Sequence, residues 1–155
     1  MALATKGSYH KPHVVRRIRD KSTGQLLDVP VETRALNISS KTFDIIQEGM
    51  YRCVNMPGGT GNAAKVSGVV VAGKTGTAQN PHGKGHAWFI GFAPLDHPKI
   101  AICVLAENAG FGGVVAAPIA GMCIEQYIYG ELIRNKPQVK NAPHAPARVD
   151  TTVND

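Results

Sequence analysis

Residues 73–77 read Gly-Lys-Thr-Gly-Thr, which places a cationic side chain and two hydroxyl groups within four positions. With residues 68–72 they satisfy the P-loop pattern G-x-x-x-x-G-K-[ST], in which backbone N–H groups and a lysine hold nucleotide phosphates. That pattern needs a loop at its variable positions and a helix after the lysine. Here the variable residues 69–72 are Val-Val-Val-Ala, which favour a strand, and Gly and Pro within residues 76–83 oppose a helix. The backbone therefore disfavours nucleotide binding, which is kept as a minor alternative.

The same residues also fit the end of a strand. Residues 66–72 are rich in β-branched side chains and predict a strand that continues through residues 73–78. Residues 86–93, which are rich in aromatic side chains, and the apolar residues 99–106 predict two more strands. Because consecutive strands joined by short, turn-rich connections pair with their neighbours, we expect an antiparallel meander.

Two helices are predicted beside these strands. The first is capped by Ser39 or Ser40, and the second opens at Pro118 and ends near Gly130. The expected apolar face of the first helix comprises Phe43, Ile45, Ile46, Met50 and Val54. The expected contact face of the second comprises Ile119, Met122, Cys123, Gln126 and Tyr127. The sequence thus predicts an α+β fold, an antiparallel meander with a C-terminal helix, whose sheet needs covering on its face.

The N-terminal segment predicts a helix end followed by a hairpin. Residues 1–6 read as the last turn of a helix that Gly7 stops, and residues 9–20 and 25–30 read as extended runs around a turn. Six of the 17 Lys and Arg residues precede position 22, a density that also occurs in phosphate-binding patches. Valine and isoleucine interrupt these charges, and no aromatic platform accompanies them. A solvated hairpin is therefore favoured, with no nucleic acid and no membrane contact expected for this segment.

Composition places the chain among globular proteins of one domain. It has 155 residues, 43% of them hydrophobic, and a formal net charge of +6. No stretch reaches the roughly 18 apolar residues that cross a bilayer, and no signal-peptide layout begins the chain, so a soluble piece is expected. Three cysteines stand without metal-ligand spacing and are expected as buried free thiols, with no metal and no cofactor. Residues 1–134 are expected to fold, and residues 135–155 are expected to form a disordered tail.

The order of these features resembles the C-terminal part of the transpeptidase domain of class B penicillin-binding proteins, and most of all penicillin-binding protein 2. The resemblance runs from about residue 1 to residue 134, and residues 73–79, Gly-Lys-Thr-Gly-Thr-Ala-Gln, match the family's active-site edge strand. It implies a β-lactamase-like fold and the cross-linking of peptidoglycan stem peptides through an acyl-serine intermediate. It also implies that β-lactams bind the complete domain.

The resemblance also implies a role for each motif residue. Thr75 and Thr77 would offer hydroxyl groups to the substrate carboxylate, and Gly76 would let the substrate backbone pair along the strand edge. Lys74 would supply a positive charge beside the catalytic hydroxyls, and the Thr77 backbone N–H would be one arm of the oxyanion hole. His86 is expected at the rim of the site, with an ordinary surface histidine as the alternative.

The family's nucleophile is absent from the expected positions. Its serine and lysine belong to an S-x-x-K motif on a helix, helped by an S-x-N loop, and no S-x-N occurs in this chain. Residues 8–11 fit S-x-x-K in spacing only, because an extended run before Pro12 cannot place both side chains on adjacent helical turns. We therefore expect this piece alone to be inactive, although the parent would be a serine-type D,D-transpeptidase.

Two further expectations concern the parent protein. The resemblance implies that it acts at the extracytoplasmic, periplasmic face of the bacterial inner membrane, with other cell-wall synthesis proteins as partners. The alternative within the same fold is a noncatalytic module that senses penicillin or binds peptidoglycan.

Overall fold

The computed structural model describes residues 1–134, and its contacts divide the chain into two units. The first unit is Met1–Ile46 and the second begins at Gln47; each is described by itself. The expected tail, residues 135–155, lies outside the described residues. No helix within residues 1–134 is long and apolar enough to span a membrane.

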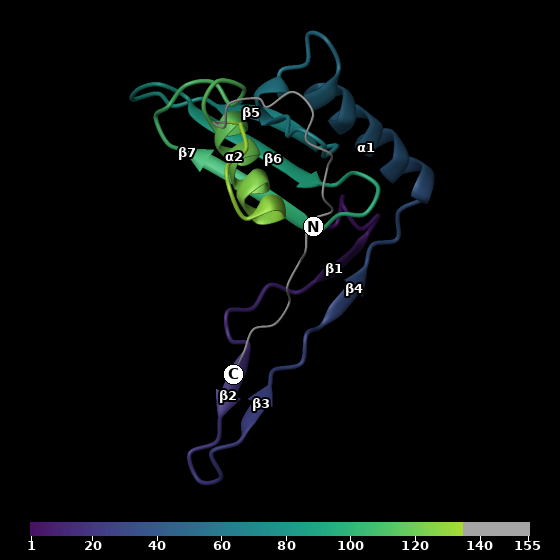
Figure 1. Ribbon diagram of the computed structural model, residues 1–155, viewed down its shortest axis with the longest axis vertical. Helices are drawn as coiled ribbons and strands as arrows, with labels where there is room; N and C mark the ends of the chain where they lie inside the picture. The colour runs from purple at the N-terminus through teal and green to yellow at the C-terminus, as the bar shows by residue number, and fades with distance from the viewer. Residues whose placement is uncertain (135–155) are drawn as a thin grey trace. The chain divides into compact units, whose positions relative to one another are not determined.

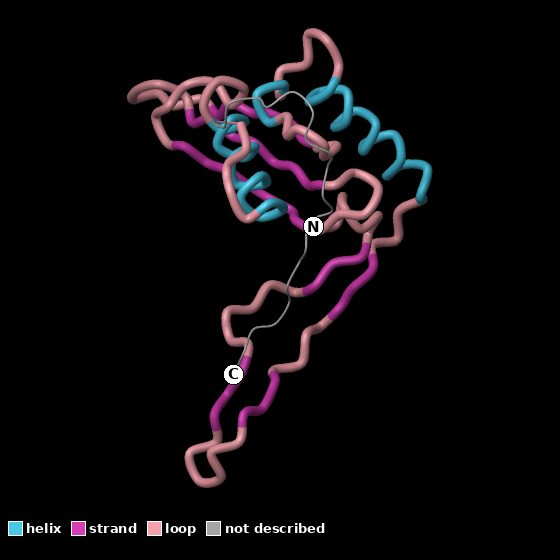
Figure 2. The backbone as a smooth tube through the Cα atoms, in the orientation of Figure 1, coloured by secondary structure: helices cyan, strands magenta, loops and turns pink. Residues whose placement is uncertain are grey.

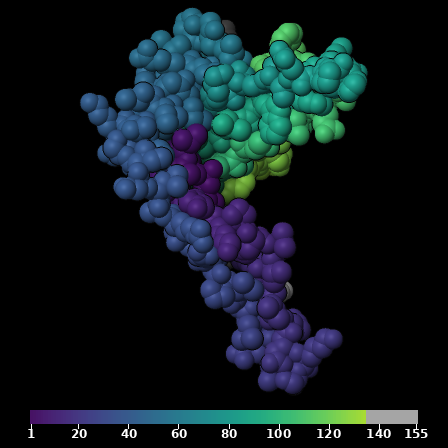
Figure 3. All heavy atoms as spheres, turned by 180° about the vertical axis from the view of Figure 1, so that it is seen from behind, coloured from purple at the N-terminus to yellow at the C-terminus, as the bar shows by residue number. Residues whose placement is uncertain are grey.

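The first unit contains the predicted hairpin, divided into two short ladders (Figures 1 and 2). β1 (Ser8–His10) pairs with β4 (Thr33–Ala35), and β2 (Arg17–Arg19) pairs with β3 (Leu26–Asp28), both antiparallel. Prolines, which have no backbone N–H to donate, lie between the two ladders on both strands. All six residues of β2 and β3 are exposed, and Figure 3 shows this segment open to solvent on the visible face.

The turn of the hairpin is organised by Asp20. Its Oδ1 accepts hydrogen bonds from the Ser22 hydroxyl at 2.6 Å, the Ser22 N–H at 2.7 Å and the Thr23 N–H at 3.2 Å. These bonds favour the charged carboxylate and lower the pKa of Asp20 from its ordinary value, with the Ser22 hydroxyl as the largest cause. Gly24 then takes a left-handed φ of 73°, which returns the chain toward β3.

The N-terminal residues form hydrogen-bonded turns rather than the predicted helix end. The predicted stop at Gly7 is confirmed, because its φ is 102°, a conformation that side chains rarely adopt. A Cβ there would also lie 3.0 Å from the ring of the buried Phe43. Only glycine combines this backbone angle with close contact to Phe43.

The first predicted helix is confirmed as α1 (Ser40–Asn55). Ser39 Oγ accepts a hydrogen bond from the Thr42 N–H at 3.3 Å, so Ser39 is the capping residue. The predicted apolar face is only partly correct: Phe43, Met50 and Val54 are buried, but Ile45 and Ile46 are 64% and 39% exposed. Phe43, Met50 and Val54 are seven and four residues apart, so they form one stripe along the helix, and the two isoleucines lie outside this stripe.

The second unit is built on a three-stranded antiparallel sheet, which confirms the predicted meander and the α+β class (Figure 1). β5 (Ala72–Ala78), β6 (His86–Ala93) and β7 (Ile100–Ala106) pair in that order, with β5 at the edge. α2 (Ala116–Tyr129) packs against β6, β7 and the short 3-10 helix Asn62–Ala64. The core between them contains Phe89, Val71, Val54 and Ile124.

The predicted strand over residues 66–72 is wrong, because β5 begins only at Ala72. Before it, Val66 and Val69 form an isolated antiparallel bridge around a turn, and Gly68 takes a left-handed φ of 74°. A tight turn at Gly68 overrides the β-propensity of the valines, and Val71 is buried in the core. The motif strand is therefore shorter than the sequence predicts.

α2 is confirmed, but it contacts the sheet through a face other than the predicted one. Its buried residues are Ala116, Ala117, Ala120, Gly121, Ile124 and Glu125. Ile119 and Tyr127 are 36% and 57% exposed, and Cys123 is also exposed. Alanine and glycine, which make up four of these six residues, let a helix backbone lie close to its neighbours, and Ile124 is the large apolar residue of this face. The helix ends as predicted at Gly130, whose φ is 75°.

The cysteines are free, as predicted, but the expectation that they are buried is wrong. Cys53 is half-buried, and Cys103 and Cys123 are exposed. Cys103 lies on β7, where alternate side chains face away from α2, so an apolar strand sequence did not imply burial on both faces.

Candidate functional site

The motif residues lie on the edge strand β5, with β6 as its only neighbour in the described sheet. Lys74 pairs with Ile90, Thr75 with Phe89 and Thr77 with Ala87. Because opposite residues of a ladder share a face, Thr75 and Thr77 lie on the face that packs against α2. Lys74 and Gly76 lie on the other face.

The face that carries Lys74 is open around this residue among the described residues, although Ala72 and Phe92, further along the same face, are buried. Lys74 shares it with Ile90 and Cys103, which follow it across the sheet, and with Leu105. Ile90 on the central strand and Leu105 on the edge strand β7 are 41% and 45% exposed, so two large apolar side chains of this face are open to solvent. The Lys74 ammonium donates to the Thr75 carbonyl oxygen at 2.7 Å, and it pairs with no carboxylate among residues 1–134. Its charge is therefore available on an uncovered apolar surface.

The Thr75 hydroxyl belongs to a short row of hydrogen-bonding groups. Thr75 Oγ1 lies 2.7 Å from Thr60 Oγ1, and Thr60 Oγ1 lies 3.4 Å from Cys53 Sγ. Cys53 is near the end of α1, and Thr60 is in the loop that follows. The sequence reasoning missed Thr60, because no local pattern links a loop residue to a strand residue 15 positions later.

The Thr77 hydroxyl is held by the loop between β7 and α2. The Gly112 N–H donates to Thr77 Oγ1 at 3.4 Å. A Cβ on Gly112 would lie 2.2 Å from the Trp88 carbonyl oxygen and 2.3 Å from that of Gly76, so only glycine fits there. The sequence analysis assigned no role to this loop, although Gly110, Gly112 and Gly113 are the kind of residues that allow a close backbone approach.

Pockets lined by described residues lie beside the C-terminal half of β5. One of about 430 Å³ is lined by Thr77, Gln79, Asn80, Pro81, Gly83 and Gly85. Another, of about 410 Å³, is lined by Thr77, Lys84, Gly85, Ala109, Gly110, Phe111 and Val114. Thr77 and Gly85 border both, so the last motif hydroxyl stands between two concave surfaces.

His86 has a structural contact next to this site. The Asn108 N–H donates to His86 Nδ1 at 3.1 Å, and the Asn108 side chain accepts a bond from the Asn80 amide. His86 lines neither of the two pockets beside Thr77. Through this hydrogen bond its ring links the residues after β7 to the start of β6.

Two sequence patterns that compete with this site have the wrong backbone. Lys74 and Thr75 lie inside β5, where a P-loop would begin a helix. Ser8 lies in β1, so the spacing of Ser8 and Lys11 does not put them on adjacent turns of a helix. The extended backbone predicted at Lys74, Thr75 and Ser8 is confirmed, whereas the strand predicted for the variable residues of the P-loop pattern begins only at Ala72.

Comparison with known proteins identifies the family. Residues 1–125 match the family described as the penicillin binding protein transpeptidase domain. The chain is 34% identical to the peptidoglycan D,D-transpeptidase MrdA of Haemophilus influenzae over 89% of its own length, and 31% identical to MrdA of Acinetobacter baumannii over 91%. It spans about a quarter of these relatives, 23% and 22% of their length.

Solved structures agree with this match. Penicillin-binding protein A of Mycobacterium tuberculosis, as a ceftriaxone acyl-enzyme complex, has a TM-score of 0.69 at 28% identity, covering 80% of this chain and 29% of that one. PBP2 of Pseudomonas aeruginosa has a TM-score of 0.64 at 29% identity, covering 84% and 29%. The predicted resemblance to class B penicillin-binding proteins is confirmed, and the chain belongs to the penicillin-binding protein transpeptidase domain family.

Proposed function

We propose that this chain forms the substrate-binding wall of a peptidoglycan D,D-transpeptidase and that the nucleophilic serine comes from a segment outside it. The observation that carries the proposal is the arrangement of β5. One edge of β5 is unpaired in the described sheet, and Lys74 stands on a face that is open around it. The Thr75 hydroxyl is hydrogen-bonded to the Thr60 hydroxyl, and the Thr77 hydroxyl accepts a hydrogen bond from the Gly112 N–H.

The uncovered face supports a position for the missing residues. A helix seated over Ile90 and Leu105 would bury their exposed apolar area, which favours docking by about 25 cal/mol for each Å² removed from water. Such a helix would bring a serine and a lysine close to Lys74. The positive charge of Lys74 would then favour the ionised form of the serine hydroxyl and attract an anionic substrate.

The strand edge supports the substrate's position. A stem peptide ending in D-alanyl-D-alanine is extended and carries a terminal carboxylate. Its backbone would pair with the edge at Gly76, and Thr75 and Thr77 would donate to the carboxylate. The Thr77 backbone N–H would stabilise the oxyanion of the tetrahedral intermediate, a contribution of about 3 to 4 kcal/mol where one such donor has been removed. β-Lactams would occupy the same edge.

The proposal is tested by supplying the missing segment. Residues 1–134 replace the matching part of penicillin-binding protein A of M. tuberculosis, for which a penicillin G acyl-enzyme structure is known. We expect the purified chimaera to gain the mass of one penicillin G, and the isolated 155-residue chain to gain none. A Lys74→Ala chimaera serves as the control and should be acylated much more slowly.

Two results would contradict the proposal. A folded chimaera that is not acylated, while the recipient protein is, would favour the noncatalytic alternative in which the fold only senses penicillin or binds peptidoglycan. A stoichiometric adduct on the isolated chain would place the nucleophile within it. We further propose the periplasmic face of the inner membrane as the site of action of the complete protein, and cell-wall synthesis proteins as its partners, since its relatives are peptidoglycan transpeptidases.

A further inference from the structure

We propose that Thr60 is a positioning residue for Thr75, and that Cys53, Thr60 and Thr75 form a directional hydrogen-bond relay aimed at the substrate carboxylate. The inference rests on the proposed function, because it needs a carboxylate at the edge of β5. It assigns a role to a loop residue that lies outside the Lys-Thr-Gly-Thr motif.

The direction of the relay follows from counting protons. A threonine hydroxyl has one proton to donate and two lone pairs that accept. Thr60 and Thr75, whose oxygens lie 2.7 Å apart, can therefore bond in either direction when the site is empty. If Thr75 donates to Thr60, its only proton is occupied and its oxygen lone pairs face the substrate.

A bound carboxylate removes this ambiguity. A carboxylate can only accept, so Thr75 must donate to it. The Thr75 oxygen is then free to accept from Thr60, and the Thr60 oxygen accepts in turn from the Cys53 thiol, whose sulfur is 3.4 Å away. Each proton points toward the ligand, and hydrogen bonds aligned in this way strengthen one another.

The Thr77 hydroxyl proton is directed toward the ligand in the same way, but by a different donor. Its hydroxyl oxygen accepts from the Gly112 backbone N–H, a group that can only donate. The Thr77 proton is thereby left free for the ligand. Both motif hydroxyls thus have a donor behind them, a backbone amide for Thr77 and the Thr60 hydroxyl for Thr75.

The loop that carries Thr60 is fixed on both sides. On the helix side, the Gly61 N–H donates to the Cys53 carbonyl oxygen at 2.9 Å, and the Asn62 side-chain amide donates to the Val54 carbonyl oxygen at 2.5 Å. On the other side, Gly113 packs so closely that a Cβ there would lie 2.4 Å from the Thr60 carbonyl oxygen. Thr60 is exposed as a side chain but held by its backbone, as a positioning residue must be.

The first test measures acylation in the chimaera. Thr60→Val keeps the shape of the side chain and removes its hydroxyl, so we expect acylation by penicillin G to slow about fivefold, the value of one lost hydrogen bond. A penicillin G derivative with a methyl group in place of the carboxylate offers Thr75 no acceptor, so the same substitution should slow its acylation less than twofold. Thr60→Ser should restore the rate, and Cys53→Ala should reduce it less than Thr60→Val does.

The carboxylate dependence separates the relay from a general structural role, which would affect both compounds equally. Equal slowing of both, or no slowing of either, would overturn the relay. Failure of the unmodified chimaera to react would instead count against the proposed function.

A second measurement needs no activity. In the isolated chain, three-bond NMR couplings of Thr75 should report one χ1 rotamer, which becomes averaged in Thr60→Val and stays single in Thr60→Ser. An unchanged Thr75 rotamer in Thr60→Val would also overturn the assignment of Thr60 as its positioning residue.

Discussion

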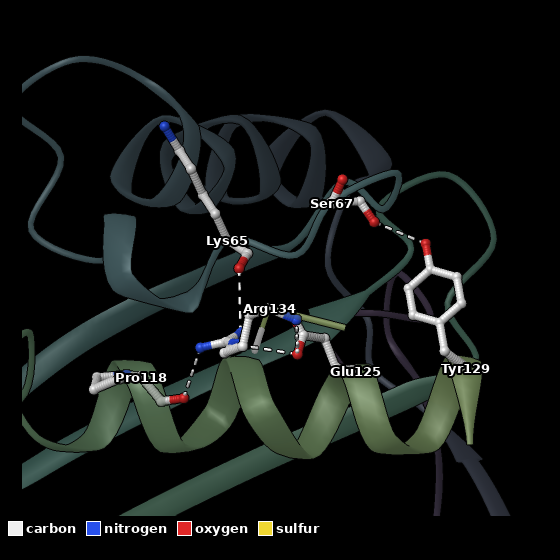
Figure 4. Close-up of polar contacts among 6 residues, drawn as sticks. All are labelled: Lys65, Ser67, Pro118, Glu125, Tyr129 and Arg134. Atoms are coloured by element: carbon white, nitrogen blue, oxygen red, sulfur yellow. Dashed lines mark hydrogen bonds and ion pairs between the residues drawn. The ribbon is translucent and has the colours of Figure 1, made fainter. Parts of the chain in front are cut away.

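Arg134 connects Pro118 and Glu125 of α2 to Lys65, in the segment that leads into β5, and these contacts allow a quantitative prediction (Figure 4). Its Nε lies 3.0 Å from Oε2 of Glu125, a carboxylate that is only 2% exposed. Its two terminal nitrogens donate to the Pro118 and Lys65 carbonyl oxygens, each at 3.4 Å. Tyr129 adds a parallel link, because its hydroxyl donates to the Ser67 carbonyl oxygen at 2.7 Å.

Arg134→Met removes the charge and keeps most of the apolar stem. Breaking a buried ion pair from one side typically costs 3–5 kcal/mol, because the remaining charge stays buried without a partner. The Arg134 side chain is 25% exposed, so water can reach part of the vacated space, and we expect the lower end, about 3 kcal/mol. For a chain of this size that corresponds to a fall in Tm of roughly 6–12 °C.

The assay is urea unfolding at pH 7, followed by circular dichroism, of the wild type, Arg134→Met, Glu125→Met and the double variant. When both charges are replaced by apolar side chains no buried charge remains, so the double variant should lose less than the sum of the single variants, with a coupling of about 2 kcal/mol. Additive single effects, or a loss below about 1 kcal/mol for Arg134→Met, would refute the view that Glu125 depends on Arg134 for its burial.

Two other predictions concern the site loop and the helix end. Gly112→Ala should slow penicillin acylation of the chimaera at least about tenfold, because the new Cβ would push the loop away from Thr77. Gly83→Ala is the matched control, because its Cβ would make only ordinary contacts at 3.6 Å. Equal acylation rates for the two variants would contradict this explanation. Burial, followed by the nearby Glu125 charge, raises the pKa of Tyr129 above its ordinary value of 10.0. The neutral phenol is thus favoured in the folded state, so its contribution to stability is complete below pH 10.0 and is lost as pH rises through the raised value. Between pH 7 and about pH 11, the free energy of unfolding in urea should therefore fall less for Tyr129→Phe than for the wild type. An identical fall for both proteins would show that ionisation of Tyr129 does not affect stability.

The motif could be read from the sequence because its signals are local. The lysine and threonines of residues 73–78 stand before a turn rich in glycine and proline, and this local pattern favours an extended backbone for them. This local reasoning was sufficient to reject the P-loop at Lys74 and the S-x-x-K spacing at Ser8, both of which lie in strands. It also narrowed the helix cap to Ser39 or Ser40, of which the structure selects Ser39, and located the helix end at Gly130.

The sequence predictions that were wrong concern a strand boundary and a helix face, which the local hydrophobic pattern alone does not determine. The valines before β5 favour a strand, but the turn at Gly68 breaks it. On α2 the large residues Ile119 and Tyr127 indicated a contact face, yet the buried face is formed by alanines, Gly121, Ile124 and Glu125. A single sequence gives the period of a helix, but the direction of its buried face depends on which element it meets.

The contacts between distant residues were decided only by the tertiary structure. Thr60 precedes Thr75 by 15 residues and Gly112 follows Thr77 by 35, and no local propensity links either pair. The sequence by itself determined which side chains stand on the edge strand: one lysine and two threonines. The fold determined which groups stand behind those hydroxyls, because hydrogen-bond partners depend on the distances that packing sets.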